Sequence, residues 1–152
     1  MKKLFTILIF LVSSQIYSQD LFEVFNFPKV IINKKYIAFT IGYSTMKNGI
    51  QSEIKYNTPN TDNPTFLTII SDNNGGKMTV TNKHITEDII INFKAIYKDN
   101  SNGKIVYHFA TTDSRCDINF YIESESNDVI ILSFNQDDKN SISYIYTLAK
   151  LY

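Results

Sequence analysis

Apolar and polar residues alternate with a period of two along most of this chain. In the segment 35–45, Ile37, Phe39, Ile41 and Tyr43 fall on one side of the alternation. The segment 88–98 repeats the pattern, and its apolar side carries Ile89, Ile91, Phe93, Ala95 and Tyr97. Successive side chains of a β-strand point to opposite faces, so this period predicts strands that each turn one face toward a core.

Turn sequences separate the alternating segments. Asn-Gly at 48–49 and Asn-Asn-Gly-Gly at 73–76 supply residues that accept positive φ, as tight hairpins require. Only 81–89 has a pattern that would fit a single helical turn. The sequence therefore predicts strands near 22–27, 29–33, 35–45, 50–57, 65–71, 77–82, 88–98, 104–111, 117–123, 128–135 and 142–151.

Consecutive strands joined by short loops predict an all-β antiparallel meander of about eight to ten strands. We expect it to close as an up-and-down barrel, with a two-sheet β-sandwich as the alternative, because closure removes exposed strand edges. The meander resembles that of calycin-type barrels. The chain has no Trp, so the Gly-x-Trp motif of those proteins cannot occur, and no family is assigned.

Two segments, 104–109 and 128–132, are apolar on both faces. A strand with one face in water should be polar on that side, so the second face needs a cover. Three covers are open: the N-terminal segment 20–27, a protein partner or second copy of the chain, and an apolar ligand.

The first 18 residues have the three parts of a secretory signal peptide. Lys2 and Lys3 precede an apolar stretch at 4–12, and a polar stretch follows. The apolar stretch is shorter than the roughly 20 residues of a membrane-spanning helix, so we expect cleavage and no membrane anchor afterwards. Residues 19–152 then form one domain of an exported protein, periplasmic or secreted.

The charge and the cysteine content limit which kinds of partner we expect the protein to bind. The chain carries 15 basic and 15 acidic residues, with no basic cluster to neutralise phosphates, so we expect no nucleic-acid binding. Its single cysteine cannot form an internal disulfide, although a disulfide between two chains remains open.

The single cysteine and the single arginine are adjacent in the chain. Arg115 would favour the thiolate of Cys116, and His108 would act as a base across a hairpin. The competing interpretation is a turn that leads into a strand, with Arg115 paired to Asp113 or Asp117 and the cysteine packed in the core. The second interpretation fits the surrounding sequence better.

Catalytic and metal-binding motifs are missing from the sequence. It contains no G-x-S-x-G, no H-E-x-x-H and no glycine-rich phosphate loop, and the two histidines, His84 and His108, have no metal-ligand spacing. We therefore expect no enzyme activity, no metal site and no cofactor.

Aromatic residues on the predicted strands offer a binding surface. Such rings line ligand pockets with apolar area and, in tyrosine, a hydroxyl group. The candidate lining residues are Tyr43, Phe93, Tyr97, Phe120, Tyr144 and Tyr146. The sequence thus predicts a carrier of a small apolar or amphipathic ligand. The alternatives are a non-catalytic interaction module of the cell envelope, docking through 104–109 and 128–132, and a small outer-membrane barrel.

Overall fold

The computed structural model describes residues 26–57, 64–82, 87–100, 103–122 and 127–149. Within these ranges the secondary structure consists of strands, without helices. The strands are β1 (Lys29–Val30), β2 (Lys34–Lys47), β3 (Ile50–Gln51), β4 (Lys55–Asn57), β5 (Thr65–Asp72), β6 (Gly75–Thr81), β7 (Ile89–Asp99), β8 (Ile105–Thr111), β9 (Cys116–Ile122), β10 (Val129–Asp137) and β11 (Asn140–Leu148). The predicted all-β class is confirmed.

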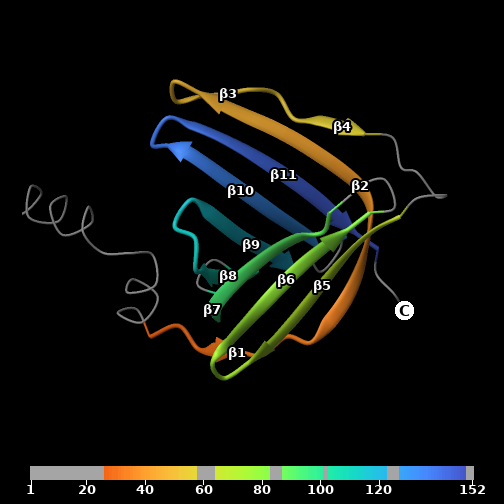
Figure 1. The fold of residues 1–152 in the computed structure, drawn as a ribbon, viewed down its shortest axis with the longest axis vertical. Helices are drawn as coiled ribbons and strands as arrows, with labels where there is room; N and C mark the ends of the chain where they lie inside the picture. Colours follow the sequence, from red (N-terminus) through yellow and green to blue (C-terminus); the bar gives the residue numbers. More distant parts are fainter. Residues whose placement is uncertain (1–25, 58–63, 83–86, 101–102, 123–126, 150–152) are drawn as a thin grey trace, which may run out of the picture.

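Eight of these strands close into an antiparallel barrel, seen in Figure 1. From β5 to β11 each strand pairs with its successor in the chain, and β11 returns to pair with β2, which also pairs with β5. The ladder β7–β8 joins the two halves of the meander. The barrel is therefore up-and-down, as predicted, and consistent with a calycin-like barrel.

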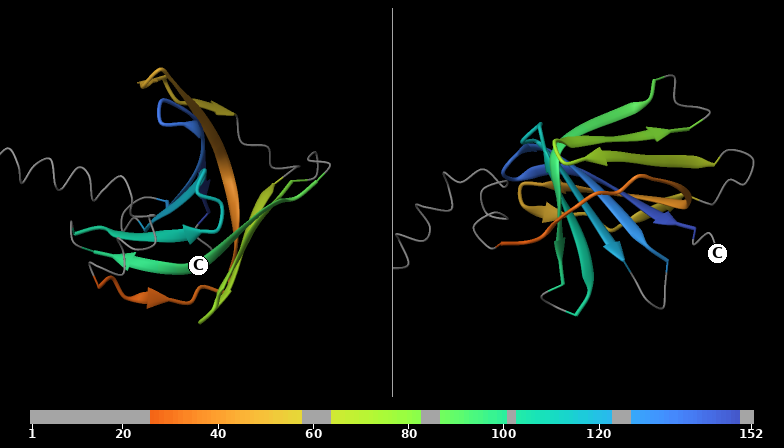
Figure 2. Two further views of the ribbon diagram at one scale, coloured as in Figure 1. Left: turned by 60° about the vertical axis from the view of Figure 1, so that its left-hand side comes forward. Right: turned by 90° about the horizontal axis from the view of Figure 1, so that it is seen from below.

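The barrel has two corners, one in β2 and one in β7 (Figure 2). Each of these strands belongs both to the half that contains β5 and β6 and to the half that contains β8 to β11. The first half of β2 pairs with β5, and beyond a register shift near Phe39 the strand pairs with β4 and β3 instead. Likewise β7 pairs with β6 up to Phe93, and beyond a shift at Phe93–Ala95 it pairs with β8 and β1. A bulge of this kind bends a strand sharply, which lets a small sheet close on itself.

These bulges correct two details of the sequence prediction. In β2, Tyr36 and Ala38 are buried while Phe39 is exposed, so Ile37 and Phe39 do not share a face with Ile41 and Tyr43. In β7, the inward position after the bulge is Ile96. An inserted residue reverses the alternation beyond it, and the period of two does not reveal where that happens.

Apolar side chains fill the interior. Six residues from three strands around the barrel have no solvent-exposed surface: Leu67, Ile69, Met78, Val80, Ile130 and Leu132. Aromatic rings pack edge to face among them, with Tyr36 and Phe120 5.2 Å apart between ring centres. Since none of the surface of these side chains is exposed to water, they are closely packed against one another and their neighbours.

One end of the barrel is fixed by turns. Asn48 and Gly49 both have positive φ and form the predicted Asn-Gly turn between β2 and β3. The Gly49 N–H donates to the Lys139 carbonyl oxygen over 2.9 Å, and the Asn48 N–H donates to the Asn140 side chain over 3.1 Å. These bonds join the β2–β3 turn to the β10–β11 hairpin.

The outer faces of β8 and β10 carry the side chains that the sequence singled out. Val106, Val129 and Ile131 are half-buried there. The signal-peptide prediction (1–18), most of the predicted strand 22–27 and of the predicted cover 20–27, and the centre of 81–89 lie outside the described residues, so they remain predictions.

Candidate ligand-binding cleft at one end of the barrel

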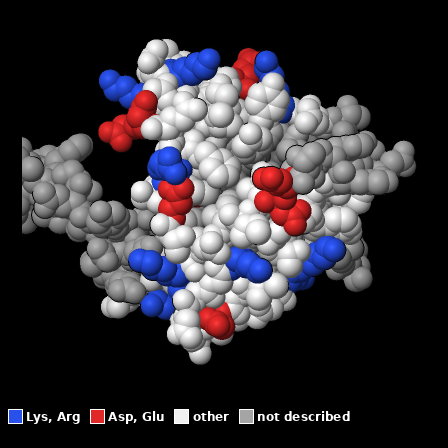
Figure 3. All heavy atoms as spheres, viewed as in Figure 1, with Lys and Arg blue, Asp and Glu red and all other residues white. Residues whose placement is uncertain are grey.

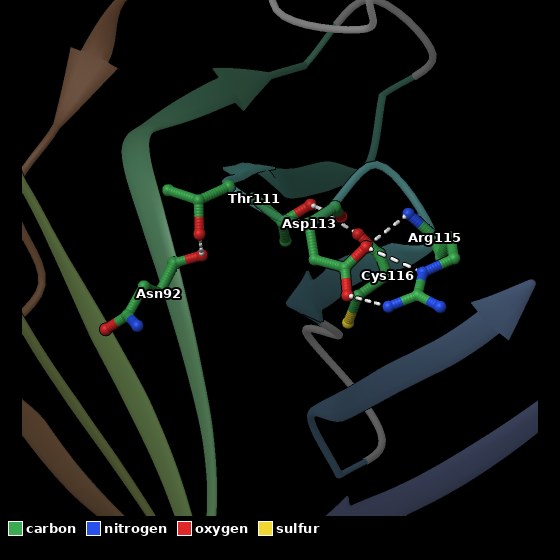
Figure 4. A network of polar contacts seen from close by, with 6 residues as sticks. Asn92, Thr111, Asp113, Arg115 and Cys116 are labelled. Carbon is green, nitrogen blue, oxygen red and sulfur yellow. Dashed lines mark hydrogen bonds and ion pairs between the residues drawn. The ribbon is translucent and has the colours of Figure 1, made fainter.

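The turn between β8 and β9 is built around Asp113 and Arg115, which face each other in Figure 4. The Arg115 backbone N–H donates to the Asp113 side chain over 2.9 Å, and the Cys116 N–H donates to the Asp113 carbonyl oxygen over 3.0 Å. A short polar side chain that accepts from the backbone two residues on is a common way to close a turn. The Thr111 hydroxyl contacts the carbonyl oxygens of Asp113 and Cys116 from the other side.

The two charged side chains of this turn form a two-pronged ion pair. The Arg115 guanidinium donates to the Asp113 carboxylate through Nε over 3.2 Å and through Nη2 over 3.1 Å. The hydrogen bond from the arginine side chain, followed by that from its backbone, lowers the pKa of Asp113, and the same carboxylate raises the pKa of Arg115. Both groups remain charged around neutral pH, and their charges cancel locally.

The β10 strand is held directly against this turn. The Asn135 N–H donates to the Arg115 carbonyl oxygen over 2.7 Å, and the Asn135 side-chain amide donates to Asp117 over 3.0 Å. The end of β10 therefore has a fixed position relative to the Asp113–Arg115 pair.

An open cleft of about 440 Å³ lies where these elements meet. Its lining residues are Asp113, Arg115, Phe134, Asn135, Gln136 and Ile142. Phe134 and Ile142 pair across β10 and β11 and continue the inward rows of those strands beyond the filled core. The cleft thus has an apolar wall toward the barrel interior and a rim of polar side chains.

Cys116, Arg115 and His108 are not brought together. Cys116 is a free thiol, only 2% exposed among the core side chains. Burial, followed by the charges of Asp117 and Asp113, raises the pKa of Cys116 to about 11, so the thiol is protonated at neutral pH. His108 lies on the outer face, where Nδ1 is 2.7 Å from the Asn119 side chain and Nε2 is 3.6 Å from Asp99.

The six aromatic residues predicted to line a pocket occupy three kinds of position. Phe93, Phe120 and Tyr146 are buried in the packed interior. Tyr97 pairs with His108 and shares its outward face, because it follows the β7 bulge. Tyr43 and Tyr144 pair with each other toward the cleft end, and the Tyr144 ring packs edge to face on Phe134, with 6.1 Å between ring centres. Whether any of them contacts a ligand remains a prediction.

Of the residues that line the cleft, Arg115 was proposed from the sequence as a candidate site residue, and for different chemistry. A signal was nevertheless present in the alternation, because Phe134 continues the row of Ile130 and Leu132. What the alternation could not show is that this row meets the turn at Asp113, about 20 positions away in the chain.

Neither metal binding nor a membrane-spanning helix is indicated in the described part of the chain. No three His, Cys, Asp or Glu side chains in those ranges are grouped closely enough to hold a metal ion. The same ranges contain no helix with the length and apolar character to cross a bilayer.

Comparison of the chain with known protein families, with curated proteins and with solved structures found no match.

Proposed function

We propose that this chain is an exported β-barrel protein that binds a small amphipathic ligand in the cleft at the end of its barrel. The observation that carries the proposal is the cleft itself, with its apolar wall of Phe134 and Ile142 and its polar rim. Its volume of about 440 Å³ falls within the range of small-molecule sites in proteins. The signal-like residues 1–18 support export.

The packed interior supports a ligand at the barrel end rather than along the barrel axis. Leu67, Met78 and Leu132, on three strands around the barrel, have no solvent-exposed surface. The apolar interior also differs from the polar interior of an outer-membrane barrel, so it favours the hypothesis of a ligand-binding protein over that of an outer-membrane barrel.

Binding without catalysis is the form of the proposal that the lining residues support. The cleft-lining residues include no serine, cysteine, lysine or histidine. Hydrogen bonds from Arg115 lower the pKa of the Asp113 carboxyl group in the cleft. Asp113 is therefore ionised at neutral pH and is a poor proton donor.

The test is binding of an amphipathic fluorescent dye, 1-anilinonaphthalene-8-sulfonate, to the folded, processed protein. We expect saturable binding that Phe134→Ala weakens about tenfold, since removal of a ring from a binding surface costs on the order of 1.4 kcal/mol or more. Ile90→Ala is the matched control, because Ile90 is an apolar residue of β7 that is 56% exposed and is not among the residues that line the cleft. No binding by the native protein, or equal losses in both variants, would contradict the proposal.

A protein-interaction role is the second candidate, and one observation favours it. Val106, Tyr121 and Val129 pair in register on adjacent strands and form an apolar row across the outer faces of β8, β9 and β10. Size-exclusion chromatography with light scattering tests self-association through this row. A dimer that Val129→Lys dissociates supports the role, and a monomer at every concentration contradicts the homodimer.

A further inference from the structure

We infer that the ligand of the cleft is a neutral saccharide, an inference that rests on the proposed function and names its ligand class. Four of the six lining residues, Asp113, Arg115, Asn135 and Gln136, have planar polar side chains. A planar group with two donors or acceptors side by side matches two neighbouring hydroxyl groups of a sugar ring.

The apolar wall complements the other surface of a sugar. One face of a pyranose ring presents C–H bonds, which are apolar and carry a slight positive charge, and such bonds stack on the negative face of an aromatic ring. Phe134 supplies that ring beside the polar rim, and Ile142 extends the apolar area. A molecule with hydroxyl groups along its edge and C–H groups on its face meets both halves of the cleft at once.

Three of the four polar residues of the rim are hydrogen-bonded before any ligand arrives. Asp113 is bound to Arg115 by two side-chain hydrogen bonds, and the Asn135 amide is bound to Asp117. These bonds leave capacity for a ligand: three of the five N–H donors of Arg115 and the side-chain oxygen of Asn135 remain. Pre-positioned polar groups reduce the conformational entropy lost on binding, which matters most for weakly binding, strongly hydrated ligands such as sugars.

Charge distinguishes a neutral ligand from an anionic one. The two charges that line the cleft belong to one ion pair and cancel. Over the face of the molecule in Figure 3, basic and acidic side chains are both present, and several of opposite sign lie side by side. A carboxylate or phosphate ligand would gain no net attraction from the Asp113–Arg115 pair, whereas hydroxyl groups can bond to either partner.

The experiment is an NMR titration of the isotope-labelled, processed protein with three neutral disaccharides that differ in linkage and substituents: cellobiose, maltose and N,N′-diacetylchitobiose. We expect at least one to shift the amide signals of the turn 113–116 and of 134–136. Phe134→Ala should weaken that binding about tenfold, and the exposed Gln136→Ala should weaken it several-fold without affecting the fold. Gln51→Ala, on β3, is the matched control and should bind like the native protein.

The outcomes separate this inference from the proposed function. If the dye binds at the cleft but no disaccharide shifts these signals, the saccharide inference is wrong and the proposed function stands. Disaccharide shifts that map elsewhere overturn the inference as well, and so does tighter binding of glucuronate than of glucose when these two monosaccharides are titrated in the same way. If neither dye nor disaccharide reaches the cleft, the proposed function fails too.

Discussion

Cys116 illustrates how position decides the chemistry of a residue. Arg115, its neighbour in the chain, turns its guanidinium to Asp113, while Cys116 is buried in the core, where the charges of Asp117 and Asp113 add to the effect of burial on its pKa. The basic neighbour that would favour a thiolate in the sequence therefore does not do so in the fold.

The first prediction concerns the reactivity of this thiol. With a pKa of about 11, against an ordinary value of 9.0, the thiolate fraction at pH 8 falls about a hundredfold, and burial blocks reagents further. We expect the native protein to react with Ellman's reagent at least a hundred times more slowly than the same protein in guanidinium chloride. Equal rates in the two states would mean that Cys116 is accessible.

The second prediction is a loss of stability in alkali. Burial is the main cause that raises the pKa of Tyr36 and of Tyr146 to about 12, as it raises that of Cys116 to about 11. Each group ionises more easily in the unfolded chain, so its contribution is complete below the unfolded pKa and is lost as pH rises through the folded value. The free energy of unfolding should fall from about pH 9 upward.

Tyr146→Phe provides the check on this effect. Removal of the hydroxyl group removes one ionisation. Between pH 10 and 12 the free energy of unfolding, measured in urea, should therefore fall by about 2 kcal/mol less than in the native protein. A curve as steep as that of the native protein would show that Tyr146 ionises freely in the fold.

At the scale of single elements, two glycines in strands test how tightly the strands fit. A Cβ on Gly76 of β6 would collide with the Ile70 carbonyl oxygen and lie 2.7 Å from the Ser71 Cα, both backbone atoms. A Cβ on Gly42 of β2 would lie 2.8 Å from the ring of Tyr56, whose side chain is 57% exposed and can move aside.

The third prediction follows from that contrast. Gly76→Ala should destabilise the protein by about 3 kcal/mol, because the β5–β6 ladder must shift. Gly42→Ala should cost less than about 1 kcal/mol, because loss of the Tyr56 contact is partly offset by the lower entropy of the unfolded chain. Chemical denaturation of the two variants measures both, and equal costs would refute the packing at Gly76.

Most strands were predictable because each has one face toward the core. The segments 65–71, 77–82 and 104–111 differ from β5, β6 and β8 by a residue or two at their ends. The predicted strand 50–57 is two short pieces, β3 and β4, because β2 offers each only a brief stretch beyond its bulge. The bulges were not predictable, since Phe39 and Ala95 are apolar residues at positions where an uninterrupted alternation also places apolar residues.

The cleft was less predictable than the strands because it depends on contacts between distant segments. The polar rim combines residues of the turn at Asp113 with residues of β10. The apolar wall combines Phe134 of β10 with its pairing partner Ile142 of β11. Each residue looks ordinary in its own segment: Asp113 fits a turn and Gln136 fits a strand end. Only the closed barrel places them around one space.

At the scale of the whole molecule, the closed ladder makes the two halves of the barrel depend on each other. Every barrel strand is paired on both sides, and β2 and β7 belong to both halves. A fold connected in this way should unfold in one cooperative step.

The fourth prediction tests that dependence by hydrogen exchange. The slowest amides of β5 and β6 should exchange with the same free energy as those of β10 and β11, since both need global opening. The measurement is native-state exchange at low denaturant. A difference of several kcal/mol between the two groups would mean that the halves open separately.

The pairing of β2 with β11 also determines when the barrel can close during synthesis and export. The N-terminal barrel strand leaves the ribosome, and in our proposal the export channel, well before its partner Asn140–Leu148 has been made or has crossed. Until then β2 and β10 present bare backbone edges to any other unfinished chain. The protein should therefore depend on chaperones that keep the chain unfolded during export. A chain truncated before β11 should aggregate rather than remain in solution as a partial barrel.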